Sequence, residues 1–252
     1  DPETVMTAEA EVRSKDRVVV KWTGYVDPGI MPGSDQTRGA YSLPESAAVA
    51  VVIDYYLAPV SPFSYLGGDR LTKLVRDTGV EVNTYPIDMT KVFPATGGLP
   101  LKQRAPERQA YRLAELRRWR DFLDIPLVPE PRYFPADATP ASLMIIAARE
   151  QSLDALGLSQ RILRACWAEE RDIADRATLV ALADEFGVNG EALMQHSTAA
   201  EITQRFESET QAAIGRGVFG VPTYAVGDEL FWGQDRLEFV ERKINQVSAS
   251  IR

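Results

Sequence analysis

The feature that most constrains the fold is a strand-helix-strand unit that begins near residue 50. The apolar run AVAVVIDYYL (48–57) has the pattern of a buried strand, and residues 64–78 show helical spacing that ends at Gly79. VEVNTYPID (80–88) indicates a second strand. Two strands joined through a helix are expected to run parallel, with a right-handed crossover. The chain therefore predicts an α/β fold that starts with a βαβ unit.

A long helical stretch separates this unit from the remaining strands. Between 97 and 200 the apolar residues recur every three or four positions, in several short segments. Strand character returns in VPTYAVGDELFWG (221–233), where a Gly-Asp pair suits a tight hairpin turn, and a final helix follows. The simplest architecture with this order is a thioredoxin-like core, residues 49–96 and 201–247, interrupted by a large inserted all-helical domain.

Residues 1–48 differ in composition from the rest of the chain. They are rich in Gly, Pro, Ser, Asp and Thr around one strand-like piece, Arg17 to Val26. We expect a partly irregular N-terminal extension, in which this piece forms a hairpin or an edge strand.

Charge and residue counts exclude several classes of function. The formal net charge is −8 without a long basic run, which argues against a nucleic-acid partner. Cys166 is the only cysteine and His196 the only histidine. Neither an intramolecular disulfide nor a CxxC pair can form, and a cysteine- or histidine-based metal centre is not expected.

No segment suggests a membrane partner. The longest apolar run, Ala47 to Ile53, is far shorter than a membrane span. The first residues lack the charged-then-apolar pattern of a signal peptide, so we expect a cytoplasmic protein.

The turn after the first core strand contains two serines, in Ser61-Pro62-Phe63-Ser64. One interpretation is purely structural: Ser61 caps the helix, and Pro62 occupies its first position. Thioredoxin-type folds, however, place Cys-x-x-Cys at this turn, where the helix N-terminus stabilises a thiolate. A serine cannot exchange disulfides, but it can donate a hydrogen bond to the thiolate of a bound ligand. Both interpretations can hold for Ser61.

Two further features lie near the C-terminus. Val221-Pro222 stands at the entry to a strand, where the proline marks either an edge or first-residue position or a cis peptide bond facing the active turn. In the second case the backbone of Val221 is free to pair with an extended peptide ligand. Gln234 and Asp235 follow the last strand, where Asp235 is expected to cap the final helix, to bind the ammonium of an amino-acid-like ligand, or both.

Together these segments resemble a known family. DYYLAPVSPFSYLG (54–67), RDIAD (171–175) and AIGRGVFGVPTYAVGDELFWGQDRL (213–237) are similar to the 2-hydroxychromene-2-carboxylate isomerases, relatives of kappa-class glutathione transferases and of DsbA-like thioredoxin-fold proteins. The resemblance extends from about 49 to 245 and is strongest in 218–237.

The resemblance implies a glutathione-dependent isomerase of aromatic compound metabolism, with glutathione as its cofactor and a hydroxychromene-carboxylate-like small molecule as its substrate. Ser61 would contact the glutathione sulfur, Val221 before a cis Pro222 would pair with the glutathione backbone, and Gln234 and Asp235 would hold its γ-glutamyl end. Relatives are commonly dimers, so a homodimer is a possible assembly.

The resemblance also points to a substrate pocket, where this chain departs from the family pattern. Phe93 stands where the naphthalene-pathway isomerases have a lysine for the substrate carboxylate, and Lys91 or Lys102 is a possible substitute. Phe63 and Trp232 complete the set of expected pocket residues.

Two other functions stay open at this point. A kappa-class-like glutathione transferase would use the same thiolate but release a conjugate. A non-catalytic DsbA-like binding protein would keep the peptide groove without sulfur chemistry, and would not bind glutathione.

Overall fold

The structure, a computed structural model, describes residues 7–14, 17–23 and 51–251. It divides the chain into two compact units, Asp1–Ala47 and Ala48–Arg252. None of the described helices is both long and apolar enough to cross a membrane.

The described part of the first unit is an antiparallel hairpin. β1 (Thr7–Ser14) pairs with β2 (Arg17–Thr23), from Thr7 opposite Thr23 to Ser14 opposite Arg17. The strand-like piece that begins at Arg17 therefore forms one arm of a hairpin. Its partner was not expected from the sequence, because the side chains of TAEAEVRS are mostly small or charged. The predicted irregular remainder of 1–48 lies outside the described residues.

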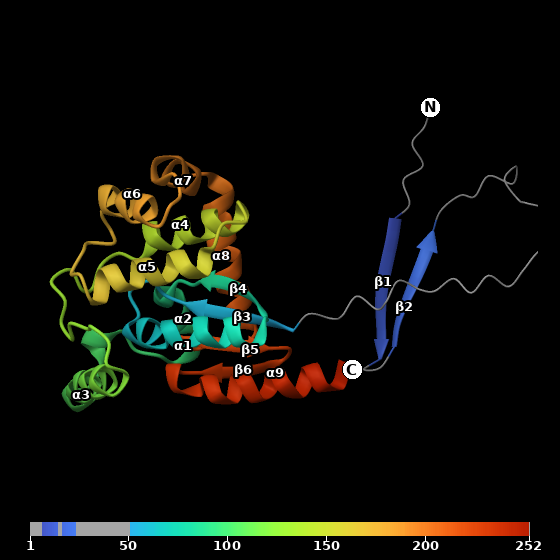
Figure 1. The fold of residues 1–252 in the computed structure, drawn as a ribbon, viewed down its shortest axis with the longest axis horizontal. Helices are drawn as coiled ribbons and strands as arrows, with labels where there is room; N and C mark the ends of the chain where they lie inside the picture. Colours follow the sequence, from blue (N-terminus) through green and yellow to red (C-terminus); the bar gives the residue numbers. More distant parts are fainter. Residues whose placement is uncertain (1–6, 15–16, 24–50, 252) are drawn as a thin grey trace, which may run out of the picture. The chain divides into compact units, whose positions relative to one another are not determined.

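The second unit is built on a four-stranded mixed sheet in the order β4-β3-β5-β6 (Figure 1). β3 (Val52–Leu57) and β4 (Glu81–Pro86) run parallel, as the βαβ pattern predicted. β5 (Thr223–Val226) pairs antiparallel with β3, and β6 (Glu229–Trp232) antiparallel with β5. This sheet is the thioredoxin-like core.

Helices cover both faces of the sheet. α1 (Pro62–Thr78) and α9 (Leu237–Ile251) pack on one face, and α2 (Met89–Thr96) and α8 (Ala200–Gly215) on the other. The alternation of side chains along a strand separates the two cores, so that Tyr55 of β3 lies in the first and Tyr56 in the second. The N-terminus of α1 is thereby held at the carboxyl end of β3.

Between α2 and α8 all the regular elements are helices. The elements are η2 (Leu101–Gln103), α3 (Pro106–Leu123), α4 (Thr139–Glu150), α5 (Ala155–Trp167), α6 (Arg176–Glu185) and α7 (Gly190–Ser197). Their common core surrounds α4 and α5 and includes the fully buried Trp167. Side chains at the α1 end of the sheet, Phe63 and Leu66 among them, pack against the same core. The helical segment therefore lies directly beside the start of α1.

Candidate active site

Ser61 is the N-cap of α1. Its backbone is extended, and its Oγ accepts a hydrogen bond of 3.2 Å from the backbone N–H of Ser64, while Pro62 takes the first helical position. The structural interpretation of this turn is confirmed. The Ser61 oxygen acts as an acceptor in this bond, so its hydroxyl proton stays available for a second partner at the helix N-terminus. The side chain is 8% exposed, in a position where a bound group would be shielded from water.

The cis peptide bond that the resemblance implied is present between Val221 and Pro222. Thr223, the next residue, pairs with Tyr56 near the carboxyl end of β3, and Ser61 follows that end by four residues. The proline turn and the helix N-terminus therefore lie at the same edge of the sheet. β5 is an internal strand, so Pro222 is not an edge-strand proline.

The backbone of Val221 is free to bind a ligand. Among the described residues no hydrogen bond involves its N–H or its C=O. The neighbouring groups are engaged: the carbonyl of Pro222 accepts from the Gly233 N–H at 2.9 Å, and the Thr223 hydroxyl donates to the Gly220 carbonyl at 2.7 Å. Val221 thus lies in a turn held by hydrogen bonds of its neighbours and presents an N–H donor and a C=O acceptor, the arrangement that an extended peptide requires.

Gln234 and Asp235 occupy a short 3-10 turn, η3 (Gln234–Arg236), before α9. Asp235 does not cap the final helix, and that prediction was wrong. The extra turn moves the start of α9 to Leu237, and the Asp235 carboxylate accepts a hydrogen bond of 2.9 Å from its neighbour Arg236 instead. Asp235 is exposed, whereas Gln234 is 3% exposed and faces α1. Asp235 is therefore the member of the pair whose carboxylate a ligand can reach.

Two residues that the sequence analysis did not identify hold η3 against α1. The Arg70 guanidinium donates to the Gln234 carbonyl at 2.7 Å, and burial lowers the pKa of Arg70. At Gly67 a β-carbon would lie 2.8 Å from the Tyr224 hydroxyl and 3.2 Å from the Gln234 Cβ. Two consecutive glycines inside a helix were a usable signal of such a close approach, whereas nothing in the sequence distinguishes Arg70 from other arginines.

The expected pocket residues fall in separate places. Phe63 is half-buried and packs against the helical core. Trp232 is 53% exposed at the end of β6, and its ring contacts that of Phe219, in the loop that leads to Pro222, in a tilted arrangement with the ring centres 4.7 Å apart. Trp232 thus lies beside the proline turn, on the edge strand β6, whereas β4 forms the other edge of the sheet.

Phe93 lies on α2, and Lys102 lies on η2, between α2 and α3. The ring of Phe93 is half-buried beneath the guanidinium of Arg104, at 5.6 Å. Lys102 is exposed on η2. The positive group in contact with Phe93 is therefore an arginine rather than either lysine.

Cys166, the only cysteine of the chain, is buried on α5. Burial raises the pKa of its thiol to about 12, with a smaller contribution from Asp172. At neutral pH this thiol is protonated and enclosed. The chain's own cysteine consequently supplies no thiolate to the site.

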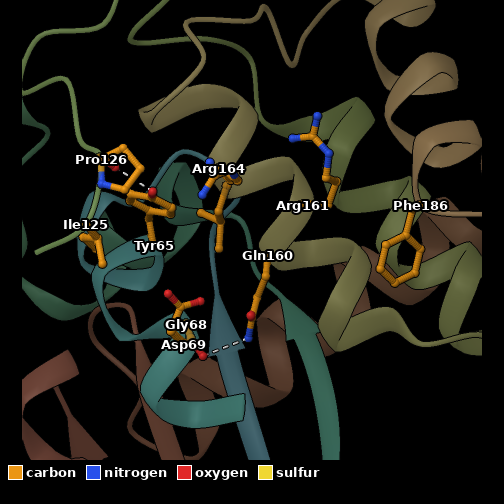
Figure 2. Close-up of a pocket in the computed structure, with 10 residues that line it drawn as sticks. Tyr65, Gly68, Asp69, Ile125, Pro126, Gln160, Arg161, Arg164 and Phe186 are labelled. Atoms are coloured by element: carbon orange, nitrogen blue, oxygen red, sulfur yellow. Dashed lines mark hydrogen bonds between the residues drawn. The ribbon is translucent and has the colours of Figure 1, made fainter. Parts of the chain in front are cut away.

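A cavity of about 260 Å³ lies between α1 and α5 (Figure 2). Tyr65 and Gln160 border it, and each is fixed by a hydrogen bond: the Tyr65 hydroxyl donates to the Pro126 carbonyl and the Gln160 amide to the Gly68 carbonyl. None of the residues predicted for the site lines this cavity. It is a feature separate from the Ser61 turn.

The sheet order, the cis-proline turn and the helix N-terminus that faces it define a thioredoxin-fold protein with serines in place of the redox cysteines. The family model of the DSBA-like thioredoxin domain matches residues 52–245. The chain belongs to this family and, within it, to the 2-hydroxychromene-2-carboxylate isomerases, as the resemblance indicated.

Three relatives illustrate the relationship. A protein of Pseudomonas sp. (strain C18) named 2-hydroxychromene-2-carboxylate isomerase is 34% identical over 198 residues, which cover 77% of this chain and 90% of that protein. Glutathione S-transferase kappa 1 of Caenorhabditis elegans is 24% identical over 206 residues, 77% of this chain and 91% of that one. A solved structure of a 2-hydroxychromene-2-carboxylate isomerase superposes with a TM-score of 0.69 at 29% identity, covering 78% of this chain and 95% of that one.

Proposed function

We propose that this protein is a glutathione-dependent isomerase that acts on a 2-hydroxychromene-2-carboxylate or a related conjugated aromatic compound. The observation that carries the proposal is that the Ser61 hydroxyl, at a helix N-terminus, and the free backbone of Val221, before the cis proline, lie at the same edge of the sheet. Three relatives named for this isomerase, at 30–34% identity, support the reaction class.

The residues present suit the tripeptide glutathione. The Val221 N–H and C=O would pair with its cysteinyl backbone, which would place the thiol toward the start of α1. The exposed carboxylate of Asp235 would pair with the ammonium of the γ-glutamyl group. Gln234, whose side chain is buried, would act through its backbone, which Arg70 holds against α1.

Bound glutathione would supply a thiolate that adds reversibly to the conjugated substrate and forms a C–S bond. A carbon–carbon double bond of the substrate would thereby become single and rotate, and it would be restored when the C–S bond breaks. Ser61 would donate a hydrogen bond to the sulfur, and the α1 N-terminus would favour its negative charge. The protein's part is therefore to lower the pKa of a ligand thiol and to hold the substrate against it. Glutathione would leave the cycle unchanged.

Calorimetric titration with reduced glutathione, combined with thiolate absorbance of the complex against pH, tests this proposal. We expect wild type and Ser61→Ala to bind, with the pKa of the glutathione thiol lowered in the wild type and less so in the variant. Asp175→Ala is the matched control, because Asp175 caps α6 through the Thr178 N–H at 2.8 Å and lies on another helix. Each cap substitution should cost about 1 kcal/mol of stability, but only Ser61→Ala should change the pKa of the glutathione thiol.

Absence of binding at millimolar glutathione would overturn the proposal and favour a non-catalytic binding protein that retains the groove. A glutathione transferase is the second candidate, and the kappa-class relative at 24% identity supports it. Product analysis separates the two, because a transferase consumes one thiol for each product.

A further inference from the structure

Three arginines line the start of α3. Arg104 ends η2, and Arg108 and Arg112 follow at intervals of four residues, so that the last two lie one turn apart on the same face of the helix. The side-chain amide of Gln109 donates to the Arg104 carbonyl at 2.7 Å and holds Arg104 at the first turn. The chain has an overall charge of −8, yet it gathers positive charge along this edge.

Aromatic rings flank two of these guanidinium groups. Arg104 lies 5.6 Å from the ring centre of Phe93, and its Nε donates to the Leu99 carbonyl at 2.8 Å. Arg112 lies 5.2 Å from the ring of Phe134 and 5.7 Å from that of Trp167. Both arginines are half-buried, and the flat rings restrict how their guanidinium groups can turn.

The charges around Arg104 and Arg112 differ from those around the later arginines of α3. Within the described residues no carboxylate lies at ion-pair distance from Arg104 or Arg112, whereas Arg118 and Arg120, further along α3, pair with Glu115 and Asp121. Burial, together with the charge of Arg104, lowers the pKa of Arg112 to about 10, and Glu130 only partly offsets this. Burial and the charge of Arg108 likewise lower the pKa of Arg104. Both groups remain charged at neutral pH, and an anion between them would relieve their repulsion.

The arginines lie at the same edge of the sheet as Ser61. Phe93 belongs to α2, which follows the carboxyl end of β4, and β4 runs parallel to β3. Phe134 packs in the same core as Phe63, two residues after Ser61. Figure 1 shows α3 at the end of the unit toward which β3 points.

We propose that Arg104 and Arg112 bind the carboxylate of the substrate, and that Phe93 and Phe134 contact its aromatic part. Arginine forks match a carboxylate with two parallel hydrogen bonds, and an anion between two such groups gains from both charges. This inference rests on the proposed function, whose substrate it would anchor. It assigns to these arginines the role that the sequence analysis considered for Lys91 or Lys102.

The glycyl carboxylate of glutathione has the same chemistry, so the experiment titrates each ligand separately. Benzoate, its uncharged analogue benzamide, and reduced glutathione are titrated by calorimetry into wild type, Arg104→Met and Arg112→Met. Arg117→Met is the matched control, because Arg117 is an exposed arginine of the same helix. Arg112→Lys keeps the positive charge but loses the guanidinium that can make two parallel hydrogen bonds to a carboxylate. It replaces Arg112→Met in the experiment if that variant does not fold.

We expect benzoate affinity to fall about tenfold or more in Arg104→Met and Arg112→Met, and less in Arg112→Lys. Benzamide and glutathione affinities should stay within about twofold in every variant, and Arg117→Met should behave as wild type. Equal benzoate affinity in all proteins, or no benzoate binding to wild type, would overturn the inference. So would a loss of glutathione affinity alone, which would assign the arginines to the cofactor.

The inference and the proposed function can fail separately. If benzoate binding depends on the arginines but glutathione does not bind, the anion site stands and the isomerase proposal fails. If glutathione binds and its thiol pKa falls, while benzoate affinity is the same in wild type and in the arginine variants, only the inference is overturned.

Discussion

The Arg70 guanidinium donates a hydrogen bond of 2.7 Å to the carbonyl oxygen of Gln234. This bond joins the third turn of α1 to η3, two segments separated by 164 positions in the chain. Its consequence is that the two proposed ends of the glutathione site, the α1 N-terminus and Asp235, are held by one rigid connection. The guanidinium also lies 5.5 Å from the ring of Trp119 on α3, so a single side chain of α1 contacts two further elements, η3 and α3.

Arg70→Met should weaken this connection. The buried Gln234 carbonyl would lose its donor, which costs about 1–3 kcal/mol of unfolding free energy, and the position of Asp235 would loosen. We expect glutathione affinity to fall together with stability. Urea unfolding and calorimetry measure the two quantities. Arg76→Met is the control on the same helix, because Arg76 is exposed and, among the described residues, pairs only with its neighbour Asp77. It should change stability and glutathione affinity by little.

Two adjacent glycines of α1 should respond differently to alanine. A β-carbon at Gly67 would meet the buried Tyr224 hydroxyl at 2.8 Å, so Gly67→Ala should lower the free energy of unfolding by about 1–3 kcal/mol. At Gly68 the nearest atom is the end of the flexible Gln160 side chain, at 3.3 Å. There, relief of the glycine penalty within a helix should leave stability unchanged or raise it by up to about 1 kcal/mol. Equal losses in the two variants would contradict the close packing of η3 on α1.

Cys166 should be unreactive in the folded protein. A thiol pKa of about 12 leaves only about one molecule in ten thousand as thiolate at pH 8, because a raised pKa favours the protonated form. Alkylation by iodoacetamide at pH 8 should therefore be slower by a factor of about a thousand or more than for the unfolded chain. Mass spectrometry follows the label with and without urea. Rapid labelling of the native protein, or loss of activity in Cys166→Ser, would contradict a purely structural role.

Local patterns sufficed for much of the fold. The βαβ unit, the all-helical stretch after α2, and the hairpin of β5 and β6 each follow from apolar spacing and turn residues within one segment. The exception at the C-terminus is instructive. Asp235 has the residue type and the position of an N-cap, but the chain inserts one 3-10 turn there, and no single side chain marks that choice.

The site was predictable only in part. Ser61 and Pro222 could be singled out because a helix N-cap and a proline at a strand entry leave local signals, although their residue roles stay proposals. Arg70, Arg104 and Arg112 could not, since the significance of Arg70 depends on its bond to η3, and that of the other two on rings contributed by other elements. The β1 strand was not predicted because its residues show little alternation of apolar and polar side chains.

The fate of the glutathione thiol during turnover tests the proposed isomerase activity most directly. The protein is incubated with 2-hydroxychromene-2-carboxylate, with and without reduced glutathione, while absorbance follows the product and titration follows free thiol. We predict that conversion to the trans-benzylidenepyruvate requires glutathione and leaves the amount of free thiol unchanged. Equally fast conversion without glutathione, or the loss of one thiol for each product formed, would contradict the proposal of a glutathione-dependent isomerase.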